Sequence, residues 1–235
     1  MVGDADDLIL SLHEFFPERA QGLAHFLERE NGKTPRLEEW RERQLGNFIQ
    51  TLILSAADLK RAFVEKRITT LAWTTRNLLE LSIWIDYCNL SEVHAKRFRD
   101  DAARDLYGLS HAVQSLEVDD KGIEDPQLKQ SQQNLVTFAQ SWGINALEDD
   151  FTKVAAAAKE LGRDRRFLSL NKLLSKLAHP TAWAVNSVRS IDADEDFRGI
   201  FLSDGVEMAT DSLTSIRAFV IAVLPLPKGA ANLNP

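Results

Sequence analysis

The stretch that decides the fold is LAWTTRNLLELSIWIDYC, residues 71–88. Its apolar side chains fall on every side of a helix, a pattern that predicts a helix buried in the centre of the molecule. Arg76 and Glu80 interrupt this pattern at the i, i+4 spacing that allows two side chains to pair. Because charged side chains are costly in apolar surroundings unless they are paired, we expect a specific contact to hold both of them.

The Arg76–Glu80 pair has two interpretations. A guanidinium oriented by a carboxylate can bind a phosphate or carboxylate group. Asn77 adds a polar group for ligand binding on the same turn. The alternative is a core ion pair that fixes the helix in register. Helical spacing places the pair on one face with four apolar or aromatic residues: Trp73, Ile83, Trp84 and Tyr87.

Composition favours an all-α fold. Only 11 Gly and 7 Pro occur in 235 residues, and long stretches are rich in Ala, Leu, Glu and Arg. We therefore predict a multi-helix bundle of seven to nine helices in a single domain, residues 1–235. Helices within 5–31 could pack as an appendage, the region near 190–205 is expected to be an irregular loop, and the tail 225–235 is expected to be loosely ordered.

Periodicity, caps and breakers predict the helix boundaries. Pro126 and Pro180 mark a start and an end, and Gly162 marks another end. The expected helices span residues 5–16, 18–30, 36–67, 69–90, 91–117, 126–141, 146–162, 164–178 and 206–224.

Several classes of function are disfavoured by the sequence. A net charge of −7 provides no global basic field and no DNA-binding signature. The single Cys88 allows no internal disulfide and fits a reducing compartment.

The N-terminus lacks a signal pattern, and the apolar run 218–227 is too short to cross a bilayer, so we expect a cytoplasmic protein without membrane contact. Metal and cofactor motifs are absent, so neither group is expected.

A second group of candidates leads to His179 at the end of an expected helix. Asn171, Ser175 and His179 recur every four residues and so line one face. The helix dipole favours a cationic histidine at this end, which is a sufficient structural role. The functional interpretation is a general acid/base or a phosphate contact, with Asn171 and Ser175 as ligand-binding neighbours.

A basic run between Lys159 and Lys176 precedes His179 and carries a local charge of +4. Such a run is most often a solvated helix face. The sharper interpretation is a contact to a small anion or to RNA, in which Lys172 and Lys176 would bind the ligand.

Two motifs carry a resemblance to a known family: RNLLE, residues 76–80, and SKLAHP, residues 175–180. Together they resemble a bacterial all-α family of unknown function that is loosely grouped with HEPN-type helical domains. The resemblance covers roughly residues 40–190. It implies a metal-independent ribonuclease of a toxin or defence system, acting as a homodimer.

The HEPN signature is an Arg followed, after four to six residues, by a His. This chain has that spacing from Arg19 to His25 and from Arg104 to His111, about as often as chance would give. His179 departs from it, because Lys172 stands seven residues before it. The resemblance implies His179 or His111 as acid/base and Arg76 or Arg104 as the group that stabilises the phosphorane, with Glu80 orienting Arg76.

Two hypotheses follow from the sequence. The first is a binding or regulatory module in which Arg76, Glu80 and His179 form a buried polar cluster that fixes the fold or binds a small anion. The alternative is the HEPN-like ribonuclease. A homodimer, RNA and a small anion are the candidate partners.

Overall fold

The computed structural model describes residues 39–117, 126–179 except 142 and 145, 181–186 except 183, and 195–223. Within these ranges the chain forms helices joined by short connections, with no strand, and this confirms the all-α prediction. The principal helices are α2 (Glu39–Val64), α3 (Ile68–Leu90), α4 (Glu92–Glu117), α5 (Pro126–Ser141), α6 (Val154–Glu160), α7 (Asp164–Ala178) and α9 (Glu195–Val223).

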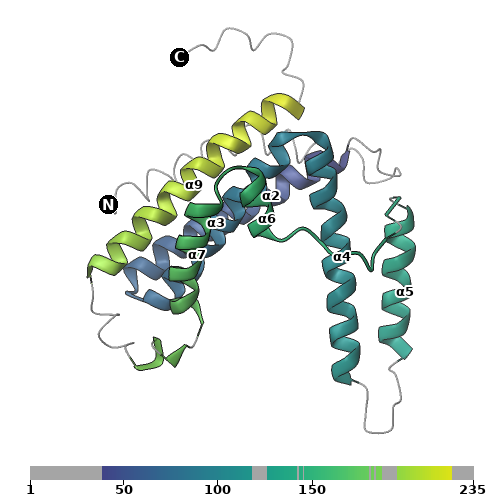
Figure 1. Ribbon diagram of the computed structural model, residues 1–235, viewed down its shortest axis with the longest axis horizontal. Coiled ribbons are helices and arrows are strands. Elements are labelled where there is room, and N and C mark those ends of the chain that lie inside the picture. Colours follow the sequence, from purple (N-terminus) through teal and green to yellow (C-terminus); the bar gives the residue numbers. More distant parts are fainter. Residues whose placement is uncertain are drawn as a thin grey trace.

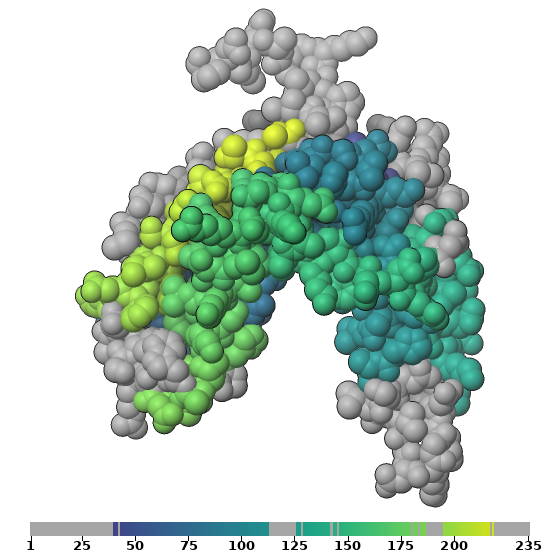
Figure 2. Space-filling view, in the orientation of Figure 1, coloured from purple at the N-terminus to yellow at the C-terminus, as the bar shows by residue number. Residues whose placement is uncertain are grey.

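Helix α3 is the centre of the arrangement (Figure 1). It contacts α2, α4, α6, α7 and α9. Helix α4 leaves the end of α3 and diverges from it, and α5 packs against α4 to form a hairpin that projects from the bundle (Figure 1). The space-filling view shows the molecule hollowed between the bundle and this hairpin (Figure 2).

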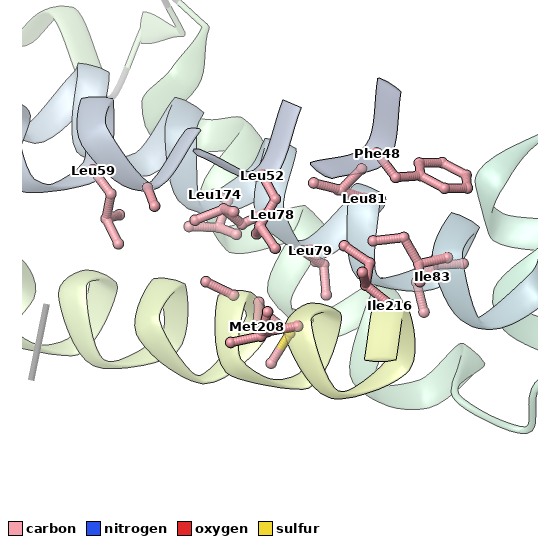
Figure 3. Packing of buried hydrophobic residues seen from close by; sticks show 14 of the residues in the cluster. Phe48, Leu52, Leu59, Leu78, Leu79, Leu81, Ile83, Leu174, Met208 and Ile216 are labelled. Atoms are coloured by element: carbon pink, nitrogen blue, oxygen red, sulfur yellow. The ribbon is translucent and has the colours of Figure 1, made fainter. Parts of the chain in front are cut away.

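The core surrounds α3, as its all-round apolar pattern predicts. In Figure 3 the α3 side chains point toward residues of three other helices. The labelled set comprises Leu78, Leu79, Leu81 and Ile83 of α3, Phe48, Leu52 and Leu59 of α2, Leu174 of α7, and Met208 and Ile216 of α9. Cys88 of α3 is also buried, and burial raises the pKa of its thiol to about 12.

Polar side chains of α3 fix its register against α9. The Thr75 hydroxyl donates a hydrogen bond of 3.0 Å to the carbonyl of Phe201. Near the other end of α3, the Asn89 amide donates to the carbonyl of Ser215 at 2.9 Å. These two bonds, at both ends of the contact, hold α3 against α9 and therefore fix which α3 residues face away from it.

The turn between α3 and α4 is a single residue, Ser91, with extended backbone. Its hydroxyl accepts a hydrogen bond from the backbone N–H of His94 at 3.4 Å, which caps the start of α4. Beyond this turn α4 is directed away from α3 (Figure 1).

Two helix starts differ from the prediction by more than one turn. Helix α6 is confined to Val154–Glu160, so the segment before it is not helical as expected for 146–162. Helix α9 begins at Glu195, so the prediction of an irregular loop near 190–205 is wrong from residue 195 onward. Glu195 and Asp196 are acidic residues in the first turn of α9, where the helix dipole favours them, and buried Phe201 anchors that end.

Other expectations lie outside the described residues. They concern residues 1–38, 118–125, 187–194 and 224–235, including the two helices expected within 5–31. Among the described helices, none is long and apolar enough to cross a membrane.

Two glycines give a matched test of the packing between α9 and α2. A Cβ added at Gly205 would lie 2.6 Å from Cδ1 of buried Leu59, whereas a Cβ at Gly108 on exposed α4 would meet nothing within 4 Å. We expect Gly205→Ala to lower the free energy of unfolding by about 1–3 kcal/mol through overpacking. We expect Gly108→Ala to raise it by about 0.5–1 kcal/mol through helix propensity. Urea denaturation of both variants measures the difference, and equal effects would contradict this packing.

Candidate functional site

Arg76, Glu80 and His179 converge, although Arg76 and His179 stand 103 residues apart in the sequence. Nε of Arg76 lies 3.0 Å from Oε1 of Glu80, and Nη1 of Arg76 lies 3.0 Å from Nε2 of His179. Because a guanidinium can only donate, Nε2 of His179 is the acceptor in this contact. The expected contact between the two motifs is therefore present.

The cluster is more accessible than a core ion pair. The side chains of Arg76 and Glu80 are 26% and 29% exposed, and His179 is exposed at the end of α7. The helix face predicted to carry the pair is only partly buried, since Trp73 is exposed whereas Ile83 and Tyr87 are buried. The predicted burial of the cluster is therefore wrong, because the pair stands at the edge of the core and reaches solvent.

Arg76 and Glu80 line a pocket of about 460 Å³, here called the wedge pocket, between α3 and α4. Both helices present a stripe to it, with residues spaced by three or four positions. The stripe on α3 is Arg76, Glu80 and Trp84, and the stripe on α4 is Phe98, Asp101, Ala102 and Asp105. A third wall comes from the segment before α6, residues Phe151, Thr152, Lys153 and Val154.

The wedge shape follows from the turn at Ser91. Trp84 and Phe98 each stand seven residues from Ser91, and their ring centroids lie 4.9 Å apart, which closes the narrow end with aromatic surface. Arg76 and Asp105 stand 15 and 14 residues from Ser91, or roughly 21 Å along each helix axis. Arg76 and Asp105 therefore lie farther from the turn than the aromatic pair, where α3 and α4 have diverged (Figure 1).

Asp101 fastens the third wall to α4. Its Oδ2 accepts the backbone N–H of Thr152 at 3.0 Å, and its Oδ1 accepts Nη1 of Arg104 at 2.7 Å. Arg104 in turn donates from Nε to the carbonyl of Ala146 at 2.9 Å. Both residues are engaged in holding the connection from α5 to α6 against α4, and Asp101 is only 6% exposed.

The alternative pair of Arg104 and His111 does not form a site with this pocket. Arg104 is engaged with Asp101 and Ala146, as described above. His111 lies about two turns further along α4, where it contacts Gln132 of α5 at 2.9 Å and the ring of Tyr107. The other pair with the signature spacing, Arg19 and His25, lies outside the described residues.

The charges around the wedge pocket nearly balance. It is lined by two cations, Arg76 and Lys153, and by three carboxylates, Glu80, Asp101 and Asp105. Glu80 pairs with Arg76, and Asp101 pairs with Arg104 just outside the lining. Among the described residues, Asp105 and Lys153 have no ion-pair partner, so the pocket offers one carboxylate and one ammonium that are not already neutralised.

The remaining predicted binding residues lie on α3 and α7 and do not line the wedge pocket. Asn77 is half-buried on α3. On α7, the Ser175 hydroxyl donates to Oδ1 of Asn171 at 3.5 Å, and the Ser175 carbonyl accepts the backbone N–H of His179 at 3.3 Å. Lys172 and Lys176 are exposed on α7 and do not line the pocket.

The basic run on α6 and α7 is partly neutralised by its neighbours. Arg163 pairs with Asp86 of α3, and Arg166 pairs with Glu207 of α9 at 2.6 Å. The hydrogen bond to Glu207 raises the pKa of the Arg166 guanidinium. Two of the cations that the sequence analysis counted toward an RNA contact thus join α7 to the bundle.

A second hollow, of about 600 Å³, lies between α2, α4 and α5 and is mainly apolar; we call it the apolar groove. It shares Trp84, Phe98 and Ala102 with the wedge pocket. Its other apolar lining includes Trp40, Phe48, Leu106, Leu135 and Phe138.

Asp105 and Lys153 line the pocket but were not predicted as site residues. The sequence does hold a signal for Asp105. Arg76 stands 15 residues before Ser91 and Asp105 stands 14 residues after it, so both lie at a similar distance from the turn that joins their helices. Lys153 had no such signal, since residues 146–162 were expected to be one helix. Comparison with models of known protein families, with curated proteins and with solved structures found no match.

The two carboxylates of the site should differ in their effect on stability. We expect Glu80→Gln to cost about 1 kcal/mol, because its ion pair is accessible to solvent. We expect Asp101→Asn to cost about 3 kcal/mol or more, because it breaks a buried pair and loosens the bond to Thr152. Chemical denaturation compares the two variants. A larger loss for Glu80→Gln would contradict this assignment of roles.

Proposed function

We propose that this protein is a small-molecule binding module in which Arg76 recognises an anionic group of the ligand. The observation that carries the proposal is the contact of Arg76 with both Glu80 and His179 at the edge of an open pocket. Glu80 and His179 hold Nε and Nη1, and among the described residues no group accepts a hydrogen bond from Nη2. A guanidinium oriented in this way is ready to bind a carboxylate or phosphate with little further ordering.

His179 supports this role as an acceptor that a ligand can displace. It is exposed and ends α7, so rearrangement of its ring disturbs little of the core. An arriving anion would accept hydrogen bonds from Nη2 and, by replacing Nε2 of His179, from Nη1. This exchange frees the imidazole of His179 from its contact with Arg76.

The proposal predicts that binding of 3-phenylpropionate, a carboxylate with an aromatic ring, depends on Arg76. We expect Arg76→Gln to weaken binding about tenfold or more, because the charge and the forked donors are both lost. Arg61→Gln is the matched control, since Arg61 is an exposed arginine on α2 that pairs with Asp58. Titration followed by backbone amide NMR measures the affinities and also reports whether each variant is folded.

A second variant keeps the test independent of the stability of α3. His179→Ala removes an exposed side chain and releases Nη1, so we expect binding of 3-phenylpropionate to be kept or strengthened. Binding that is lost in His179→Ala and kept in Arg76→Gln would contradict the role given to Arg76.

The alternative function is the HEPN-like ribonuclease, favoured by the exposed imidazole of His179 beside the guanidinium of Arg76. In that reaction His179 would accept the proton of the ribose 2′-hydroxyl as its oxygen attacks the phosphorus, and Arg76 would stabilise the charge on the phosphorane. His179 would then return the proton to the 5′-oxygen as the P–O5′ bond breaks. Single-stranded RNA incubated with the protein in EDTA tests it. Cleavage that His179→Ala abolishes would support the ribonuclease, and absence of cleavage in the parent protein would exclude metal-independent cleavage of that RNA.

Two observations favour the small-ligand proposal over the ribonuclease. The wedge pocket carries three carboxylates, which repel a polyanionic backbone. Part of the basic run is also engaged in ion pairs with Asp86 and Glu207.

A further inference from the structure

The wedge pocket has a distinct chemical order from its narrow end to its wide end. The narrow end is aromatic, formed by Trp84 and Phe98 in contact. Farther from the turn at Ser91, the lining carries opposite charges on the two helices, Arg76 on α3 and Asp105 on α4. This order matches a ligand that is apolar at one end and carries both a positive and a negative group at the other.

Balanced charge is the feature that selects among anionic ligands. A phosphate or a polyanion would satisfy Arg76 and Lys153 but would bring its charge close to Glu80 and Asp105. A lone cation would satisfy Asp105 but would meet the guanidinium. A zwitterion satisfies both walls, because its carboxylate pairs with Arg76 and its ammonium pairs with Asp105, which has no other ion-pair partner among the described residues.

The aromatic surfaces define the rest of the ligand. Trp84 and Phe98 close the narrow end, and Phe151 on the third wall is 41% exposed. An exposed aromatic ring at a pocket wall gains free energy when an apolar group covers it. The pocket volume of about 460 Å³ lies within the range of small-molecule sites.

We propose that the wedge pocket binds a free amino acid with an apolar side chain, its carboxylate on Arg76, its ammonium on Asp105 and its side chain against Trp84, Phe98 and Phe151. This inference rests on the proposed function, since it uses Arg76 as the group that recognises the anion. It adds the ligand class and gives Asp105 and Phe151 their roles.

Three probes with the same phenyl ring separate the charges. L-Phenylalanine carries both groups, 3-phenylpropionate lacks the ammonium, and 2-phenylethylamine lacks the carboxylate. We expect L-phenylalanine to bind about tenfold more tightly than either analogue, because only it pairs with both walls. NMR titration or calorimetry measures the three affinities. Equal affinity for L-phenylalanine and 3-phenylpropionate would overturn the inference.

Replacement of Asp105 is the most direct test by mutation, because this residue is exposed on α4 and its replacement leaves the core intact. We expect Asp105→Asn to reduce the affinity for L-phenylalanine to that for 3-phenylpropionate, and to leave the affinity for 3-phenylpropionate unchanged or slightly higher. Asp58→Asn, at an exposed acidic residue of α2, is the matched control. An unchanged affinity for L-phenylalanine in Asp105→Asn would overturn the inference.

The apolar groove is the competing location for any phenyl compound. Phe138 lines that groove and is 60% exposed, so Phe138→Ser tests binding there without loss of core contacts. We expect it to leave the affinity for L-phenylalanine unchanged, whereas Phe151→Ser should weaken it. The reverse result would place the ligand in the groove and overturn the inference.

Failure of the inference and failure of the proposed function are distinguishable. If 3-phenylpropionate binds through Arg76 and L-phenylalanine binds no more tightly, the amino-acid assignment fails and the anion-binding role of Arg76 stands. If neither compound binds in a way that depends on Arg76, both fail.

Discussion

The divergence of α4 from α3 at Ser91 is the constraint on which the candidate site depends. One extended residue joins the two helices, and the contact of Trp84 with Phe98 closes the space beside the turn. Asp101 then fixes the third wall by accepting the backbone N–H of Thr152. Each of these contacts is local to α3, α4 or the segment before α6, so they shape the wedge pocket outside the bundle core.

The bundle core supplies the other half of the site by fixing α3. Packing against α2, α7 and α9 buries most of α3, and Thr75 and Asn89 fix its register against α9. This register leaves Arg76 and Glu80 at the edge of the core, where they are paired but still reach solvent. The expense of partly burying two charges is offset by the contacts of Arg76 with Glu80 and His179, and the same contacts orient the guanidinium for a ligand.

Helix bounds that are marked by local residues were predicted correctly from the sequence, whereas features that depend on tertiary packing were not. The bounds of α5 and α7 were predicted correctly, because Pro126 starts one helix and Pro180 follows the end of the other. The start of α9 was missed, because Glu195 and Asp196 resemble loop residues although they suit the first turn of a helix. Arg76 and His179 were each selected from the sequence, and one of the two hypotheses joined them in a cluster. Whether they meet depends on how α7 packs on α3, which no local spacing encodes.

The most direct test of the central claim is the NMR signal of the Arg76 side chain. Comparison with Arg76→Lys, which has no guanidinium Nε–H, assigns that signal, and L-phenylalanine is then added to the full chain. The account predicts that the Arg76 Nε–H signal shifts with saturation, together with the backbone amides of Phe98, Asp105 and Thr152. An Arg76 signal that stays unchanged while amides of α2 and α5 shift would contradict the account and would place binding in the apolar groove.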